Sequence, residues 1–176
     1  MRRSAAIEWL ARALAILGGL VLVLITLLTV VSITGRSMVD WGLGPIPGDF
    51  ELVEALTAFA VFAFLPWCQL TRSHATVDVF TSFFPDGVNR VIDLVTELLM
   101  SLIIILIAWR LWHGTLDKIN YHETTFILQV PVWWGYAAAL AAALVAVVVS
   151  LYMTAVRVHE VVSGKPAFPP TQGGMH

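Results

Sequence analysis

The chain has 176 residues, of which 59% are hydrophobic and only 12% are charged. A soluble domain carries about a quarter of its residues as charged side chains, so this composition indicates an integral membrane protein. The formal net charge of −2 argues against a nucleic-acid partner, which would require a clustered basic surface. Because no repeat of 20–50 residues is visible, we expect a single membrane domain over residues 1–176.

The first transmembrane span is expected over residues 10–33. It follows a basic N-terminal segment, and residues 13–35 contain no charged side chain. This run is longer than the apolar core of a typical signal peptide, which has about 7–15 residues, so we expect it to be retained. Trp9 lies just before the span and is expected to anchor it at the membrane interface.

The second span is expected over residues 50–70. A Pro-Gly pair at 47–48 precedes an acidic first turn, where the exposed backbone N–H groups of a helix favour negative charge. Residues 55–71 contain no charged side chain and are apolar on all sides, as in a membrane helix. Arg72 then ends the run. Residues 76–84 mix polar and aromatic side chains, and we expect them to form a short helical segment lying flat at the interface.

The third and fourth spans are expected over residues 88–112 and 131–156. A polar extension of the third helix should reach the turn at 120–124. Pro131 is tolerated in the first turn of a helix, and Trp133 and Trp134 are expected to anchor the fourth span at the interface. The fold class is therefore an all-α integral membrane protein with four transmembrane helices and short interfacial helical segments.

An even number of spans places both termini on one side of the membrane, and Lys and Arg residues decide which side. The side that holds the termini carries seven such residues: Arg2, Arg3, Arg12, Arg72, Arg90, Arg157 and Lys165. The opposite side carries Arg36, Arg110 and Lys118. We therefore expect both termini in the cytoplasm, with residues 157–176 as a cytoplasmic tail.

Two carboxylates lie within the third span. Asp93 and Glu97 are four residues apart and share one face of the helix. A carboxylate at this depth is costly if it faces lipid without a partner, so it is either a proton or ion site or part of an ion pair. The partner in the second case would be Arg90 or a basic residue of another helix or subunit. No second carboxylate pair lies at matching depth, which favours the structural role.

Three more carboxylates stand at the start of the second span: Asp49, Glu51 and Glu54. They form a candidate site for a cation or a protein partner at the outer surface. The alternative is that they only favour the helix N-terminus and stay hydrated among the lipid headgroups.

No pattern for catalysis or cofactor binding stands out. Haem between membrane helices needs two histidines facing each other at similar depth, whereas the histidines here lie at expected helix ends or in loops: His74, His113, His122, His159 and His176. The sequence has no Gly-x-Ser-x-Gly, His-Glu-x-x-His or Gly-rich phosphate loop. We therefore expect no enzyme activity, no metal and no cofactor. Few polar groups lie within the spans, which makes a poor substrate pathway and favours a subunit that packs against a larger protein.

Several segments, in this order and spacing, resemble one protein family. Pro47–Glu54 precedes the second span, Arg72–Asp78 is similar to a His-hydrophobic-x-Val-Asp element, and Thr125–Trp134 is similar to a Thr-x-x-Leu-x-hydrophobic-Pro-x-Trp pattern. With the basic N-terminus and first span, they resemble the small membrane subunit, or DctQ-like protein, of tripartite ATP-independent periplasmic (TRAP) transporters. The resemblance covers nearly the whole chain.

This resemblance implies a non-catalytic subunit of a secondary transporter in the bacterial inner membrane. Its partners would be a large multispanning subunit, which carries the substrate and sodium as a moving elevator, and a soluble periplasmic protein that delivers a carboxylate-bearing solute. The small subunit would be a rigid scaffold for the large one. The alternatives are a stand-alone four-helix membrane protein that binds a cofactor or passes protons, and a self-assembling membrane scaffold.

The resemblance also suggests roles for two groups of residues. The acidic turn, together with Arg36, would contact the periplasmic binding protein or the large subunit. Arg72, His74 and Asp78 would fix the cytoplasmic turn or contact lipid headgroups.

Overall fold

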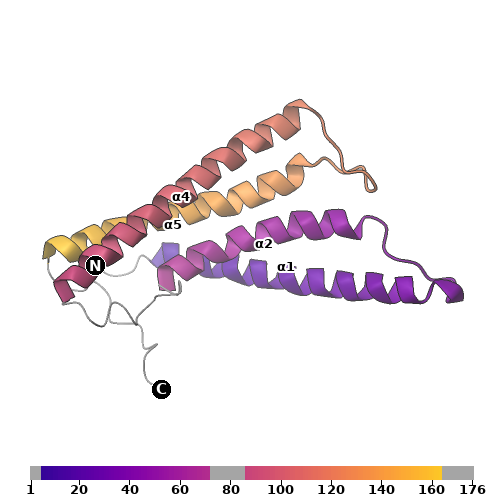
Figure 1. Cartoon of the computed structure of the whole chain (residues 1–176), viewed down its shortest axis with the longest axis horizontal. Helices are drawn as coiled ribbons and strands as arrows, with labels where there is room; N and C mark the ends of the chain where they lie inside the picture. Colours follow the sequence, from indigo (N-terminus) through magenta and orange to yellow (C-terminus); the bar gives the residue numbers. More distant parts are fainter. Residues whose placement is uncertain (1–4, 72–85, 164–176) are drawn as a thin grey trace, which may run out of the picture.

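The computed structural model describes residues 5–71 and 86–163 (Figure 1). Within these ranges the chain forms four long α-helices and one short 3₁₀-helix. They are α1 (Ala5–Ser37), η1 (Val39–Trp41), α2 (Asp49–Thr71), α4 (Asp86–Asn120) and α5 (Trp133–Ser163). Each of the four α-helices is long and apolar enough to cross a membrane. The expectation of an all-α protein with four membrane helices is confirmed.

The helices continue beyond the expected spans. The 35 residues of α4 measure about 52 Å at 1.5 Å per residue, whereas the hydrocarbon core of a bilayer is about 30 Å thick. Helix α5 also continues through Arg157 to Ser163, into the residues expected to form the cytoplasmic tail. At its start α5 is shorter than expected, since Pro131 lies outside the helix and pairs with Thr124 in an isolated β-bridge.

The helices lie side by side in the order α1, α2, α5 and α4 (Figure 1). Helix α1 packs on α2, α2 on α5, and α5 on α4, so α5 has a long neighbour on each side. The pair α1/α2 and the pair α4/α5 converge toward one end and diverge toward the other. We call the first the terminal end, where α1 begins and α5 ends. The second is the loop end, which holds η1 and residues 121–132.

Small side chains bring the helices together. A Cβ atom added to Gly135 of α5 would lie 3.0 Å from the Cβ of Ala55 in α2, and one added to Gly18 of α1 would lie 3.0 Å from the Cβ of Ala63. Such close approach increases the dispersion contacts that hold membrane helices together. The buried apolar side chains of α5 continue this interface: Ala139, Leu140, Ala142, Ala143, Ala146, Val149, Met153 and Val156.

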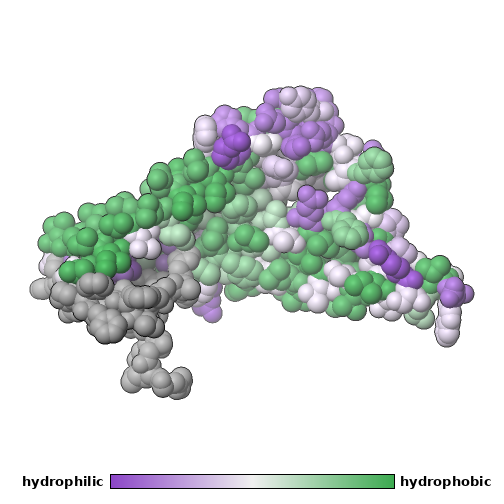
Figure 2. All heavy atoms as spheres, viewed as in Figure 1, coloured by the Kyte–Doolittle hydropathy of each residue, from purple (hydrophilic) through white to green (hydrophobic). Residues whose placement is uncertain are grey.

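The outer surface is strongly apolar over much of its area. Hydrophobic residues cover much of the face seen in Figure 2, whereas hydrophilic residues gather where α4 ends and along the loop end. Exposed large side chains include Leu20 and Leu27 of α1 and Leu99 and Leu102 of α4. Such surfaces suit contact with lipid chains or with other membrane helices.

Candidate functional site

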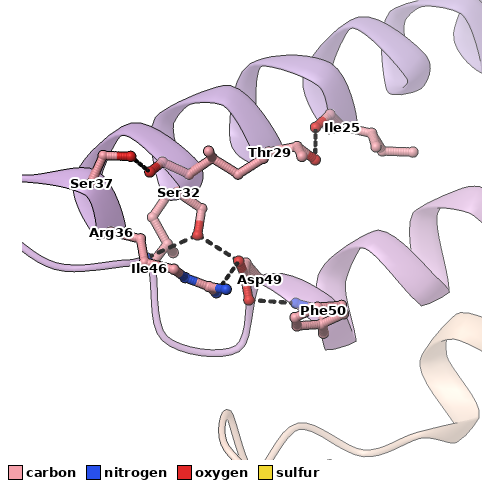
Figure 3. Close-up of polar contacts among 9 residues, drawn as sticks. Ile25, Thr29, Ser32, Arg36, Ser37, Ile46, Asp49 and Phe50 are labelled. Atoms are coloured by element: carbon pink, nitrogen blue, oxygen red, sulfur yellow. Dashed lines mark hydrogen bonds and ion pairs between the residues drawn. The ribbon is translucent and has the colours of Figure 1, made fainter.

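A first group of polar side chains joins α1 to α2 at the loop end (Figure 3). The Ser32 hydroxyl donates a hydrogen bond to Asp49 Oδ2 at 2.5 Å and accepts one from the backbone N–H of Ile46 at 3.3 Å. Asp49 Oδ1 accepts a third bond from the N–H of Phe50 at 2.8 Å. Arg36 Nη2 lies 4.0 Å from Asp49 Oδ2. Because Ser32 is buried, this bonding fixes the connection between the two helices.

Glu51 joins the start of α2 to the loop between α4 and α5. Its carboxylate accepts hydrogen bonds from the backbone N–H groups of Ile127 at 2.6 Å and Leu128 at 2.9 Å. Close packing accompanies these bonds, because a Cβ atom added to Gly48 would lie 2.4 Å from Leu128 Cγ. Gly48 also has a φ of +75°, which glycine adopts without steric cost. The loop is thus held directly on the N-terminus of α2.

The loop itself has a defined backbone. The N–H of Thr125 donates to the carbonyl of Val130 at 2.8 Å, and the N–H of Val130 donates to the Thr125 hydroxyl at 3.1 Å. Gln129 adopts a φ of +56° between them, and its side-chain amide donates to the carbonyl of Phe126. These bonds hold Phe126 at the tip with 93% of its surface exposed.

A second group of polar side chains joins α2, α4 and α5 toward the terminal end. Gln69 of α2 is buried, and its Nε2 donates to Oε1 of Glu97 in α4 at 2.8 Å. Arg157 of α5 donates from Nη1 to Asp93 of α4 at 2.8 Å and to Glu160 at 3.2 Å. We call these five residues the interhelical polar cluster.

A hydroxyl pair extends the same α4–α5 contact. Ser101 of α4 and Thr154 of α5 share a hydrogen bond of 2.8 Å, and the Ser101 hydroxyl also donates to the carbonyl of Ser150 at 3.4 Å. Both serines are buried. In a bilayer, side-chain hydrogen bonds of this kind hold helices together because no water competes for the same groups.

Comparison with known proteins identifies the family. A family model described as tripartite ATP-independent periplasmic transporters, DctQ component, matches residues 25–160, which are 136 of the 176 residues. The chain belongs to this family. The DctQ component is a part of a transporter and is not a known enzyme family. Searches of curated proteins and of solved structures gave no significant match.

The family match confirms the resemblance seen in the sequence and spans both polar groups of this DctQ chain. The residues expected to contact a partner at the outer surface differ in how far they are already bonded within this chain. Asp49 and Glu51 are bonded within the chain. The side chain of Arg36 is 59% exposed, and Glu54 is exposed without a hydrogen bond or ion pair to the described residues.

The two carboxylates near the start of α4 in the DctQ chain have different partners. Asp93 pairs with Arg157, which the sequence had assigned to the tail, and Glu97 accepts a bond from an amide. The side chain of Arg90 and the residues Arg72, His74 and Asp78 lie outside the described part. Trp9 and Trp134 are largely exposed and Trp133 less so, and their anchoring role remains a prediction.

Sequence reasoning did not single out Gln69, Arg157 or Glu160. The three-residue spacing of Arg157 and Glu160 signals one helix face, but only if α5 is known to extend that far. Gln69, a polar residue inside an apolar run, was a detectable signal. Within the described ranges, no three His, Cys, Asp or Glu side chains gather as a group that could hold a metal ion.

Proposed function

We propose that this DctQ chain is a scaffold for the large membrane subunit of a TRAP transporter in the bacterial inner membrane. By this proposal the complex uses an ion gradient, with sodium as the coupling ion, to take up carboxylate-bearing solutes. A periplasmic binding protein delivers the solute, and both termini of the small subunit lie in the cytoplasm. The observation that carries the proposal is that polar side chains join the helices of this chain to one another, while its outer faces are apolar.

The polar contacts support a rigid role. Gln69 and Glu97 join α2 to α4, and Arg157 and Asp93 join α5 to α4. Each of these four side chains bonds to a side chain of another helix. Such bonds suit a subunit that keeps its shape while a neighbouring subunit moves. Separating Arg157 from Asp93 would leave two charges without their partners, and separating Gln69 from Glu97 would leave a buried amide without its hydrogen bond, so a change of shape at this point would be costly.

The outer faces support a role as a subunit. Long apolar side chains of α1 and α4, such as Leu27 and Leu102, point away from this chain's own core. Helices of the large subunit can pack on such faces by dispersion alone. At the loop end, Arg36 and Glu54 have exposed side chains and are the best-placed candidates for contact with the binding protein or the large subunit.

The proposal is tested by expressing the tagged chain with the large subunit of the same transporter and purifying it in mild detergent. We expect the two chains to co-purify in a fixed ratio. Vesicles that hold both chains and receive the binding protein should accumulate solute under a sodium gradient, and vesicles with the large subunit alone should accumulate much less. Recovery of the small subunit alone, or full uptake without it, would contradict the proposal.

The contact residues are tested in the same vesicles. Glu54→Gln together with Arg36→Gln should lower uptake and raise the concentration of binding protein required for half-maximal uptake. Arg12→Gln with Glu8→Gln changes charges at the other end of α1 and is the matched control.

The residues proposed for the cytoplasmic turn are tested by the yield of the complex. His74→Ala with Asp78→Ala should lower this yield, and an unchanged yield would contradict the role proposed for these two residues.

A further inference from the structure

An apolar groove of about 650 Å³ lies at the loop end, where the two helix pairs diverge. Residues of α2 line one side, and the first turns of α5 with Leu111 of α4 line the other. The loop between α4 and α5 covers one end of it. The side chains that define its shape include Leu56, Phe62, Leu128, Trp134 and Tyr136. Its volume falls within the range of about 300–1,000 Å³ that is typical of small-molecule sites.

The groove has the depth of one membrane leaflet. It runs along α2 from Glu51 to Phe62, which is about 16 Å at 1.5 Å per residue. The hydrocarbon core of a bilayer is about 30 Å thick, so this length reaches from the interface to about the midplane. A partner helix would need a complementary face along a whole span, whereas a single acyl chain occupies one leaflet.

The charge at the rim indicates which headgroup belongs above such a chain. The charged residues that line the groove are Glu51 and Glu54, and no Lys, Arg or His lines it among the described residues. Glu51 is already bonded to two backbone N–H groups. Glu54 is exposed and makes no hydrogen bond or ion pair with the described residues. A carboxylate at this position attracts an ammonium group and repels an anionic headgroup.

We infer that the groove binds a phospholipid with an amine headgroup. One acyl chain lies between α2 and α5 under the loop, and the headgroup ammonium pairs with the Glu54 carboxylate. The lipid thereby fills the space between the diverging helix pairs. This inference does not depend on the proposed transport role, because the site lies within the small subunit.

The test uses the full-length chain in nanodiscs that contain equal amounts of phosphatidylethanolamine and phosphatidylglycerol. The protein is transferred to mild detergent, and the lipid that remains bound is identified by native mass spectrometry. We expect phosphatidylethanolamine to be enriched over phosphatidylglycerol. Glu54→Gln should reduce this enrichment about two- to fivefold, the effect of one partly exposed ion pair, and Glu54→Lys should reverse the preference. Asp40→Lys, in η1 and outside the groove, should leave it unchanged.

A second pair of variants tests the groove itself. Ala58 lines the groove and Val61 does not, although both are exposed on α2. Ala58→Trp should abolish the retained lipid, Ala58→Leu should reduce it, and Val61→Trp should retain it. Circular dichroism and size-exclusion chromatography establish that each variant is folded. If Ala58→Trp does not fold, the smaller Ala58→Leu change still tests the groove.

Two outcomes would overturn the inference. Lipid retained in the proportions of the nanodisc, and equally by the Ala58 and Val61 variants, would mean that only general boundary lipid is bound. Efficient cross-linking of Ala58→Cys, in a Cys68→Ser background, to the large subunit in native membranes would mean that protein occupies the groove instead.

Discussion

Arg157 joins α5 to α4 through an ion pair near the terminal end. Its guanidinium bonds to Asp93 and Glu160, and its side chain is only 13% exposed. Arginine suits this position because its planar group can serve two carboxylates from fixed directions, which a lysine ammonium does less well. The pairing also lowers the cost of placing Asp93 within a membrane helix.

Arg157→Met should therefore lower the free energy of unfolding by about 2 kcal/mol. This is less than the ~3–5 kcal/mol for a fully buried pair, because 44% of the Asp93 side chain is exposed. Arg157→Lys should lower the free energy of unfolding by a smaller amount, because the lysine ammonium keeps the charge. The measurement is thermal unfolding in detergent, with Arg12→Met, at an exposed position of α1, as the control. Equal stability of the Arg157 and Arg12 variants would show that the pair contributes nothing.

Two adjacent glycines of α1 provide a matched test of packing. A Cβ atom at Gly18 would meet Ala63 at 3.0 Å and Phe64 at 3.4 Å, whereas one at Gly19 meets nothing within 4 Å. Gly19→Ala should stabilise by about 0.5–1 kcal/mol because alanine is the better helix former. Gly18→Ala should be less stable than Gly19→Ala by at least about 1 kcal/mol, since α1 must shift away from α2. Unfolding in detergent measures both, and identical effects would mean that α1 packs differently.

At the scale of elements, the loop between α4 and α5 depends on α2 for its position. Glu51 accepts bonds from two of its backbone N–H groups, and Gly48 leaves room for Leu128. A carboxylate can offer one oxygen to each N–H, whereas an amide has a single acceptor oxygen. The loop is therefore ordered by a helix that lies far from it in the sequence.

Glu51→Gln should release this loop. We expect faster hydrogen exchange at the amides of Ile127 and Leu128, corresponding to a loss of about 1.5–3 kcal/mol in the free energy of loop opening. Asp40→Asn is the matched control, because Asp40 is an exposed carboxylate in η1 and does not line the groove. Unchanged exchange in Glu51→Gln would show that the loop is held by its own backbone bonds alone.

For the whole molecule, the orientation in the membrane follows from the distribution of charge. The sequence assigns seven Lys and Arg residues to the side of the membrane that holds the termini and three to the other side, so the terminal end should face the cytoplasm. In a Cys68→Ser background, His122→Cys at the loop end should react with a membrane-impermeant maleimide added from the periplasmic side. Val162→Cys, which is 83% exposed at the terminal end, should react only after the membrane is opened. The reverse labelling would show that the charge rule fails for this chain.

The local part of the structure could be predicted from the sequence. The charge-free runs at 13–35 and 55–71 predict membrane helices because such segments bury apolar side chains in lipid without charged groups. The turn before α2 follows from Pro47-Gly48, and the shared face of Asp93 and Glu97 follows from helix periodicity. Each of these depends only on residues close together in the chain.

The partners of the polar residues were decided by the tertiary structure. Arg157 becomes the partner of Asp93 only because α5 continues past the expected span and lies beside α4. Glu51 and Gln69 find their bonds on segments distant in sequence, and their own neighbours carry no sign of those bonds. The physical reason is that the sequence fixes hydropathy and helix period locally, whereas the angle and order in which helices pack arise from the contacts of all of them together.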